Sequence, residues 1–259
     1  MNNFFLSART LLAMAKNELR SRYSNNYGGI LWAFLQPIGT IGVLWFVFSV
    51  GFRSAPVTGH PFGLWLSVGI IGWFFVAEAI LVMTNAITSQ SFLVKKVVFN
   101  PYLIPLSSLL VALLLHLVFV GIIMIGCIAY GYYPNIHWLG MLYYLFCGVV
   151  LTLGIGYFTS SVSVFFPDIG QIVGVFLQLG FWLTPVFWSL EILPQKYLVY
   201  FELNPVSYII QGYRESLLDG VWFFEKIYLG GVFWAISLGM LFVGVLTFGK
   251  LKNSFADVL

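Results

Sequence analysis

The chain has 259 residues, of which 60% are hydrophobic and 8% are charged, and its formal net charge is +3. A soluble domain carries about 25% charged residues, so this chain lacks the polar residues that would cover a water-facing surface. Its Lys and Arg residues flank apolar runs, whereas a nucleic-acid-binding protein gathers them in a polar domain. The composition excludes an ordinary soluble enzyme and predicts an all-α membrane protein with about six spans.

The predicted elements begin with an amphipathic helix within residues 1–29, which we expect to lie in the headgroup layer. Residues 189–226 mix apolar patches with charges and prolines, so we expect two short re-entrant helices that dip into the outer interface. A polar cytoplasmic tail is predicted at 250–259, and the whole chain is interpreted as one transmembrane domain. The six predicted spans cover residues 30–52, 62–87, 103–130, 138–164, 169–188 and 227–249.

The basic residues predict the orientation, because cytoplasmic loops are enriched in Lys and Arg. One side of the predicted topology holds Arg9, Lys16, Arg20, Arg22, Lys95, Lys96, Lys250 and Lys252. The other side holds Arg53, Lys196, Arg214 and Lys226. This distribution places both termini in the cytoplasm and residues 189–226 outside.

No pattern in the chain predicts catalysis or a bound cofactor. The three histidines lie in separate regions, and neither a catalytic triad nor a metal-ligand cluster is present. Cys127 and Cys147 lie in apolar runs and are expected to be small core residues. Residues 244–250 (GVLTFGK) match the start of a phosphate-binding loop, but Leu251 replaces the required Ser or Thr and no strand precedes them. We therefore expect no ATP site, metal or catalytic residue in this chain.

Small residues recur in the predicted fourth span, at Gly148, Thr152, Gly156 and Ser160, and at Gly170 and Gly174 in the fifth. Such spacing lets helices approach closely, so we interpret it as packing. Glu78 is the only acidic residue inside a predicted span, and His116 is the only histidine. An ionisable residue there is a functional candidate. A proton-coupled carrier needs more partners than these two, and a membrane-embedded enzyme needs a clustered site, so both stay as less favoured alternatives.

Three segments carry a family resemblance. Residues 18–37 (ELRSRYSNNYGGILWAFLQP) combine a basic interfacial helix, an Arg-Tyr pair and a Trp-Ala-Phe opening of the first span. Residues 172–187 (IVGVFLQLGFWLTPVF) and 204–220 (NPVSYIIQGYRESLLDG) supply a fifth span and a returning outer segment. In this order the chain resembles, nearly end to end, the permease subunit of type-2 ABC exporters for cell-surface polysaccharides. Members often have Arg-Asp before the fifth span, where this chain has Pro167-Asp168.

The resemblance implies a transport subunit of the cytoplasmic (inner) membrane. Two copies of this chain would assemble with two copies of a separate ABC ATPase, which binds ATP and Mg. The implied cargo is a lipid-linked polysaccharide, with O-antigen on undecaprenyl diphosphate as the leading candidate. Capsular polysaccharide or teichoic acid is the alternative cargo, and no nucleic acid is involved.

The cytoplasmic side holds two candidate sites. The 88–102 loop alternates basic and apolar residues, which suits a plain topology loop or a helix that docks on an ATPase. The resemblance favours docking through Phe92, Leu93, Lys95 and Lys96, with a smaller contact at Asp168. The basic residues of the N-terminal helix suit attraction to anionic headgroups. A sharper interpretation is that Arg20 and Arg22 hold a lipid diphosphate, since Arg binds phosphate through two nitrogens.

The resemblance also implies a channel and an outer gate. Most aromatic residues are expected to face lipid or the interfaces, but aromatic rings also stack on sugars. Channel-lining candidates are Trp32, Phe34, Trp45, Trp73, Phe74, Glu78, Tyr157 and Trp182. Outer-gate candidates are Glu191, Asn204, Tyr213 and Arg214.

Overall fold

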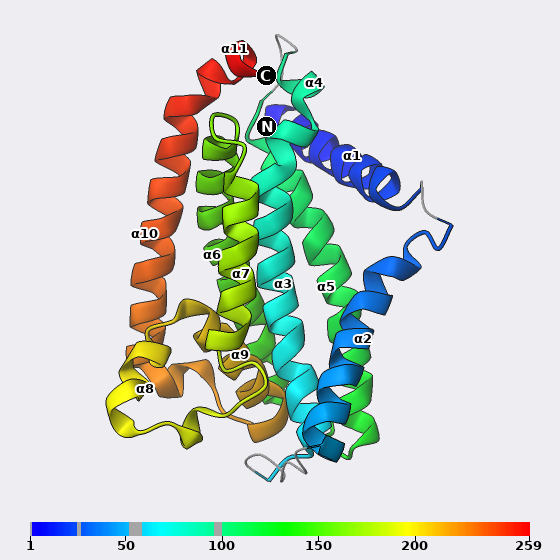
Figure 1. Ribbon diagram of the computed structural model, residues 1–259, viewed down its shortest axis with the longest axis vertical. Helices are drawn as coiled ribbons and strands as arrows, with labels where there is room; N and C mark the ends of the chain where they lie inside the picture. Colours follow the sequence, from blue (N-terminus) through cyan, green and yellow to red (C-terminus); the bar gives the residue numbers. More distant parts are fainter. Residues whose placement is uncertain (1, 25–26, 52–58, 96–99) are drawn as a thin grey trace.

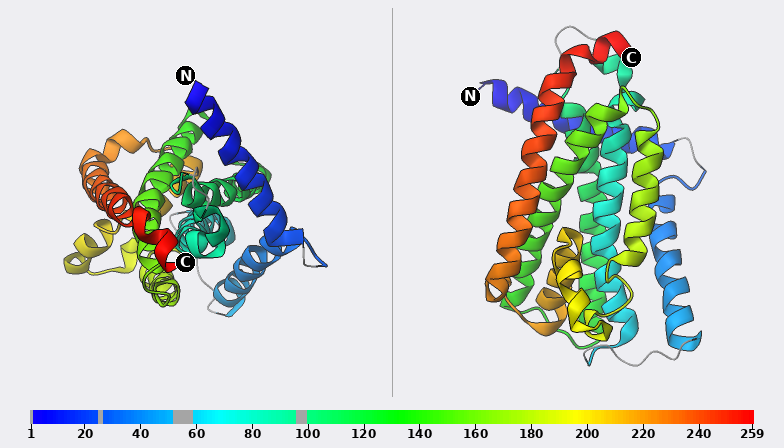
Figure 2. Two further views of the ribbon diagram at one scale, coloured as in Figure 1. Left: turned by 90° about the horizontal axis from the view of Figure 1, so that it is seen from above. Right: turned by 60° about the vertical axis from the view of Figure 1, so that its left-hand side comes forward.

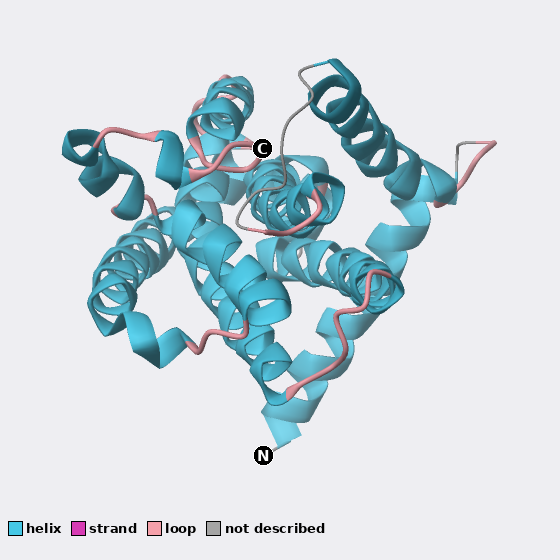
Figure 3. Ribbon diagram, turned by 90° about the horizontal axis from the view of Figure 1, so that it is seen from below, coloured by secondary structure: helices cyan, strands magenta, loops and turns pink. Residues whose placement is uncertain are grey.

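The structure is a computed structural model that describes residues 2–24, 27–51, 59–95 and 100–259. Every secondary-structure element in those ranges is a helix (Figure 3). The predicted all-α class is therefore confirmed. The principal helices are α1 (Asn2–Ser24), α2 (Leu31–Phe46, continued by the π-turn Val47–Gly51), α3 (Phe62–Ser89), α4 (Ser91–Val94), α5 (Leu103–Ala129), α6 (Gly140–Ser163), α7 (Ile169–Leu183), α8 (Gln195–Glu202), α9 (Pro205–Arg214, continued by the π-turn Glu215–Asp219), α10 (Ile227–Leu251) and α11 (Phe255–Val258).

Five helical segments are long and apolar enough to cross a membrane, and α7 is a sixth, shorter apolar helix. These six correspond in order to the six predicted spans. The five long segments are Leu31–Gly51, Phe62–Ser89, Leu103–Ala129, Ile136–Ser163 and Phe223–Val258. The prediction for the fifth span was too long, because α7 ends at Leu183 rather than at residue 188. Thr184 is extended, as expected for a residue before a proline such as Pro185.

Helix α3 is the centre of the bundle. It packs against α5, α6, α7 and α9. Of the most apolar stretch of 18 residues in α3, 67% are buried. In the corresponding stretch of α2, 0% of the residues are buried, although α2 lies beside α3. The sequence of α3 is apolar on all sides, which is typical of a helix surrounded by neighbours. The single subunit is therefore built around α3, and α2 lies at its edge (Figure 1).

The small residues of α6 pack within the same chain. A side chain at Gly148 would collide with Phe75 of α3, and one at Gly156 would collide with Met83. On another side of α6, the backbone of Gly154 meets Gly244 of α10 so closely that a Cβ on Gly244 would overlap the Gly154 carbonyl. Small residues allow this approach of two membrane helices. The expectation of packing is confirmed for α6, with α3 and α10 as the partners, but not for Gly174 of α7, which has nothing within 4 Å of an added Cβ.

The two ends of the bundle differ. Both termini and α4 lie at one end, where α1 lies across the helices rather than along them (Figures 1 and 2). Helices α8 and α9 lie at the opposite end. This arrangement agrees with the predicted topology, in which the N-terminal helix lies crosswise and residues 189–226 are on the other side. The depth of α8 and α9 in a membrane stays a prediction.

The predicted polar tail, residues 250–259, is largely helical, and one of its residues packs on the bundle. Helix α10 continues to Leu251, and Phe255 of α11 is fully buried against Phe165 and Phe248. These aromatic residues belong to a second core cluster at the end of the bundle that holds the termini. Residues 244–250, which match part of a phosphate-binding loop, lie inside α10. Cys127 and Cys147 are free and buried, as expected.

Candidate functional site

An aromatic cleft of about 610 Å³ lies between α2, α3, α5 and α7. Four of the predicted channel-lining residues line it, namely Trp32, Trp73, Phe74 and Glu78. His116, the histidine singled out in the sequence, also lines it, as do Phe75, Phe119 and Phe181, which the sequence did not indicate. Seven of the 21 residues in the wall are Phe, Trp or Tyr, and Glu78 is its acidic residue. Aromatic faces of this kind accept either an acyl chain or a sugar ring.

A polar cleft of about 680 Å³ lies between α1, α3 and α4. Its wall carries amide, hydroxyl and charged side chains, which are Asn17, Glu18, Ser21, Arg22, Glu78, Asn85, Ser89 and Gln90. Phe92 and Leu93 of α4 complete it. Two of the predicted ATPase-docking residues and one predicted phosphate-binding residue therefore line the same cleft.

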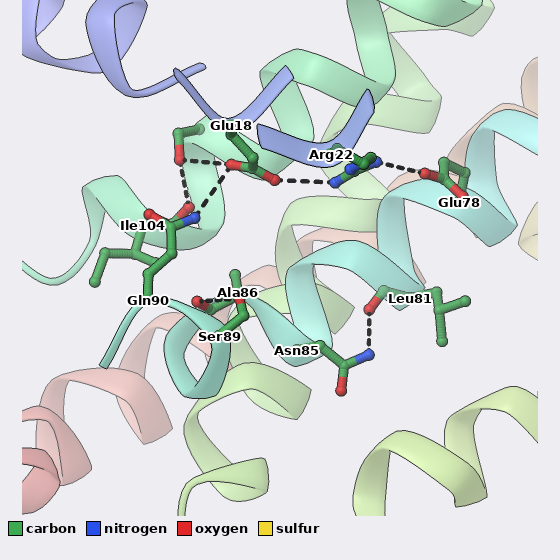
Figure 4. A network of polar contacts seen from close by, with 10 residues as sticks. Glu18, Arg22, Glu78, Leu81, Asn85, Ala86, Ser89, Gln90 and Ile104 are labelled. Carbon is green, nitrogen blue, oxygen red and sulfur yellow. Dashed lines mark hydrogen bonds and ion pairs between the residues drawn. The ribbon is translucent and has the colours of Figure 1, made fainter. Parts of the chain in front are cut away.

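Glu78 and Leu81 line both clefts, so the two cavities meet at this part of α3. Arg22 Nη1 donates to Glu78 Oε1 at 2.7 Å, and Arg22 Nη2 donates to Glu18 Oε1 at 2.9 Å (Figure 4). Gln90 Nε2 and Ser107 Oγ donate to the other oxygen of Glu18, at 3.3 and 3.2 Å. These contacts fasten α1 to α3 and α5. The spacing of Glu18 and Arg22, four residues apart on one helix, was visible in the sequence. The pairing of Arg22 with Glu78 of α3 was not.

The second phosphate-binding candidate, Arg20, is exposed on α1, away from the face that packs on the bundle. Arg22 is only partly exposed and is held between two carboxylates. Burial raises the pKa of the neighbouring Tyr23, which keeps its hydroxyl protonated, and the Arg22 charge opposes that shift. The two arginines are therefore in different electrostatic states. Arg20 is open to solvent, whereas Arg22 is already neutralised.

The remaining channel candidates lie away from the centre of the aromatic cleft. Phe34 packs on Phe119, with ring centroids 5.2 Å apart. Trp45 is exposed and covers Gly63, and Trp182 is exposed near the end of α7. Tyr157 is buried between Tyr102 and Phe248 and lines neither cleft. In the single subunit, the structure groups four of the eight candidates and leaves Tyr157 in a core cluster.

Two of the outer-gate candidates, Arg214 and Tyr213, are buried and attach α9 to other parts of the bundle. Arg214 donates to the carbonyl oxygens of Pro185 at 2.8 Å, Val186 at 2.5 Å and Trp65 at 3.3 Å. Its guanidinium also lies 3.4 Å from the centroid of the Trp65 ring. The adjacent Tyr213 hydroxyl lies 2.9 Å from His116 Nε2 of α5. Helix α9 is thus tied to α3, to α5 and to the segment after α7.

The other two outer-gate candidates lie nearer the surface. Asn204 caps α9 by accepting from the Val206 amide at 3.0 Å, and it donates to Thr184 Oγ1 at 3.1 Å. Glu191 is exposed in a short 3₁₀ turn. Next to α9, Glu215 pairs with Lys226. Burial raises the pKa of Glu215, and the nearby Lys226 charge opposes only part of that shift.

A polar cluster that the sequence did not indicate lies at the end of the bundle that holds α9. His60 Nδ1 lies 2.6 Å from the Tyr132 hydroxyl, and His60 Nε2 lies 2.7 Å from Asp219 Oδ1. The three residues come from distant parts of the chain, so no local pattern indicates the contact. In the described ranges, no group of three or more His, Cys, Asp or Glu side chains is placed to hold a metal ion.

The predicted docking residues gather at the end of the bundle that holds the termini. Phe92 is exposed on α4, Leu93 is half-buried beside it, and Lys95 is exposed directly after the helix. Lys96 lies outside the described residues. Asp168 precedes α7 in the turn after α6 and makes no side-chain cap contact. Figure 1 shows α4 and the α6–α7 turn at the same end as α1.

The apolar helices of this bundle, with α1 lying across one end of them, are those of a multi-pass membrane protein. Residues 9–218 match the family model of the ABC-2 type transporter. The chain belongs to that family. It is also 27% identical to an O-antigen export system permease protein RfbA of Klebsiella pneumoniae, over 96% of this chain and 94% of the relative.

Further relatives carry related names. An O-antigen export system permease protein RfbA of Myxococcus xanthus is 26% identical over 79% of this chain and 78% of its own length. The polysialic acid transport protein KpsM of Escherichia coli is 23% identical over 85% of each chain. The predicted resemblance to type-2 ABC permeases is thereby confirmed.

Proposed function

We propose that this chain is the permease subunit of an ATP-driven exporter that carries a lipid-linked polysaccharide across the inner membrane. The family match and the names of the relatives support this function. The single observation that carries it is the likeness to O-antigen export permeases over 96% of the chain. O-antigen on undecaprenyl diphosphate is the proposed cargo, and capsular polysaccharide or teichoic acid is the second candidate.

The proposed assembly is a homodimer of this chain with two copies of a separate ABC ATPase that binds ATP and Mg. Helix α4 suits the docking role because Phe92 and Lys95 offer an exposed aromatic ring and an exposed cation at one end of the bundle. The turn at Asp168 lies at the same end and would make a smaller contact. In this scheme both termini are cytoplasmic. ATP binding would move α4 and, through α3, tilt the bundles of the two subunits apart.

The proposed cargo route uses both clefts. The lipid diphosphate would approach α1, where Arg20 is exposed and Arg22 lies in the polar cleft. The glycan would then follow aromatic side chains such as Trp32, Trp73 and Phe74. Helices α8 and α9 would gate the outer end. Opening that gate would disturb the contacts of Arg214 and Tyr213, which tie α9 to the rest of the bundle.

Deleting the gene in its own organism tests the function. We expect surface polysaccharide to disappear and lipid-linked polysaccharide to accumulate inside the cell, with both restored by the intact gene. Normal surface polysaccharide in the deletion strain would refute the proposal. Analysis of the accumulated glycan then distinguishes O-antigen from capsular polysaccharide and teichoic acid.

A further inference from the structure

Glu18 and Glu78 hold Arg22 in different ways. The side chain of Glu18 is 14% exposed and accepts hydrogen bonds from Arg22, Gln90 and Ser107. The side chain of Glu78 is 43% exposed. Within the described part of the chain, Arg22 is its only hydrogen-bond or ion-pair partner. Glu18 is therefore fixed by the contacts that attach α1 to the bundle, whereas Glu78 is a partner that Arg22 can exchange for another anion.

The exchangeable pair lies where a ligand would meet it. Glu78 lines both clefts, and Arg22 lines the polar one. The Tyr23 hydroxyl lies beside Arg22, and Tyr23 lines the aromatic cleft. An anion in the polar cleft would thus reach the Arg22 guanidinium from the side that Glu78 occupies in this structure.

The charges at this point do not favour every anion. One guanidinium is shared by two carboxylates, so the three side chains carry a net charge of one negative unit when ionised. An arriving anion must displace Glu78 from Arg22, so only a group that binds Arg22 more strongly than a carboxylate does can take its place. A group with a single negative charge gains no more from Arg22 than the carboxylate that it replaces. A diphosphate has more charge and more oxygens for a guanidinium to bind.

We propose that Glu78 is a specificity-determining residue, which reserves Arg22 for a diphosphate and rejects phospholipid headgroups that carry one negative charge. The inference rests on the proposed function for its cargo and adds the means of selection. Rejection by a competing like charge is a general route to specificity. It is needed here because α1 lies at the end of the bundle where anionic headgroups are expected to surround it.

The test measures binding to the purified full chain in lipid nanodiscs. The probe is undecaprenyl diphosphate, and its binding is followed by tryptophan fluorescence, to which Trp32 and Trp73 of the adjoining cleft contribute. Inorganic pyrophosphate serves as a soluble probe of the same chemistry. Nanodiscs with and without phosphatidylglycerol distinguish the diphosphate from a lipid headgroup as the source of the bound anion.

We expect the native chain to bind undecaprenyl diphosphate with little change when phosphatidylglycerol is added. Glu78→Gln should bind pyrophosphate about fivefold more tightly, the factor carried by a partly exposed ion pair. In the same variant, phosphatidylglycerol should now compete with the probe. Arg22→Gln should lose binding of both anions, and Arg22→Lys should keep part of it.

Glu202→Gln is the matched control, because it removes one exposed carboxylate on α8 at the opposite end of the bundle. It should bind the probes as the native chain does. Thermal melting of each variant checks folding, and Glu18→Gln should melt at a lower temperature because Glu18 has three donors.

The inference is overturned if Glu78→Gln weakens pyrophosphate binding or leaves phosphatidylglycerol without effect. Glu78 would then be only a support for Arg22. Absence of diphosphate binding to the native chain would also overturn it. The proposed function fails separately, through normal surface polysaccharide in the deletion strain.

Discussion

The Arg214 guanidinium of α9 lies 3.4 Å from the centroid of the Trp65 ring of α3 and donates to the Trp65 carbonyl oxygen. Arg214 is 1% exposed and also donates to two carbonyl oxygens in the segment after α7. Gly69 makes room for it, since a Cβ there would collide with the guanidinium. One side chain thus holds together α9, α3 and the segment after α7.

Arg214→Lys should destabilise the protein by about 2 kcal/mol, because an ammonium group cannot reach three acceptors and stack on a ring at once. The expected loss in melting temperature is about 5 °C. Thermal melting of the purified chain measures it. Arg9→Lys, on the exposed side of α1, is the control and should melt as the native chain does. Equal melting temperatures of the two variants would contradict a stabilising role of the Arg214 contacts.

Gly244→Leu should prevent α10 from packing on α6, because its side chain would overlap the Gly154 carbonyl. Overpacking commonly costs about 1–3 kcal/mol, and a backbone contact leaves little room to relax. We expect a lower yield of monodisperse protein in size-exclusion chromatography. Gly239→Leu adds the same side chain to α10 where nothing lies within 4 Å, and it should be tolerated. If both variants behave alike, the close α6–α10 contact is not needed.

Phe92→Ala should weaken the association with the partner ATPase, because α4 would lose its exposed ring. We expect at least a tenfold loss of affinity, as is common for an aromatic residue at the centre of an interface. Co-purification of the ATPase with the tagged permease measures it. Phe224→Ala removes a similarly exposed ring from the 3₁₀ turn that precedes α10, the end of that helix remote from α11, and should leave the association intact. Unchanged co-purification of Phe92→Ala would place the docking surface elsewhere.

Hydropathy and charge are properties of short segments, so the sequence could predict the spans, the crosswise N-terminal helix and the shared side of the termini. Contacts between distant segments could not be predicted in this way. Arg22 meets Glu78 across 56 residues, and His60 meets Asp219 across 159. The packing of Phe255 on the bundle could not be predicted for a related reason. Phe255 is a lone aromatic residue in a polar stretch, and only the fold supplies the cluster that buries it.

The most direct test of the proposed function is transport by the purified permease and its ATPase in sealed proteoliposomes. The substrate would be the lipid-linked polysaccharide isolated from the deletion strain, and its arrival on the far side would be followed with a glycan-specific antibody. We expect movement that requires ATP hydrolysis and continues without a proton gradient. Movement driven by a proton gradient without ATP, and lost in Glu78→Gln, would contradict it and favour a proton-coupled carrier.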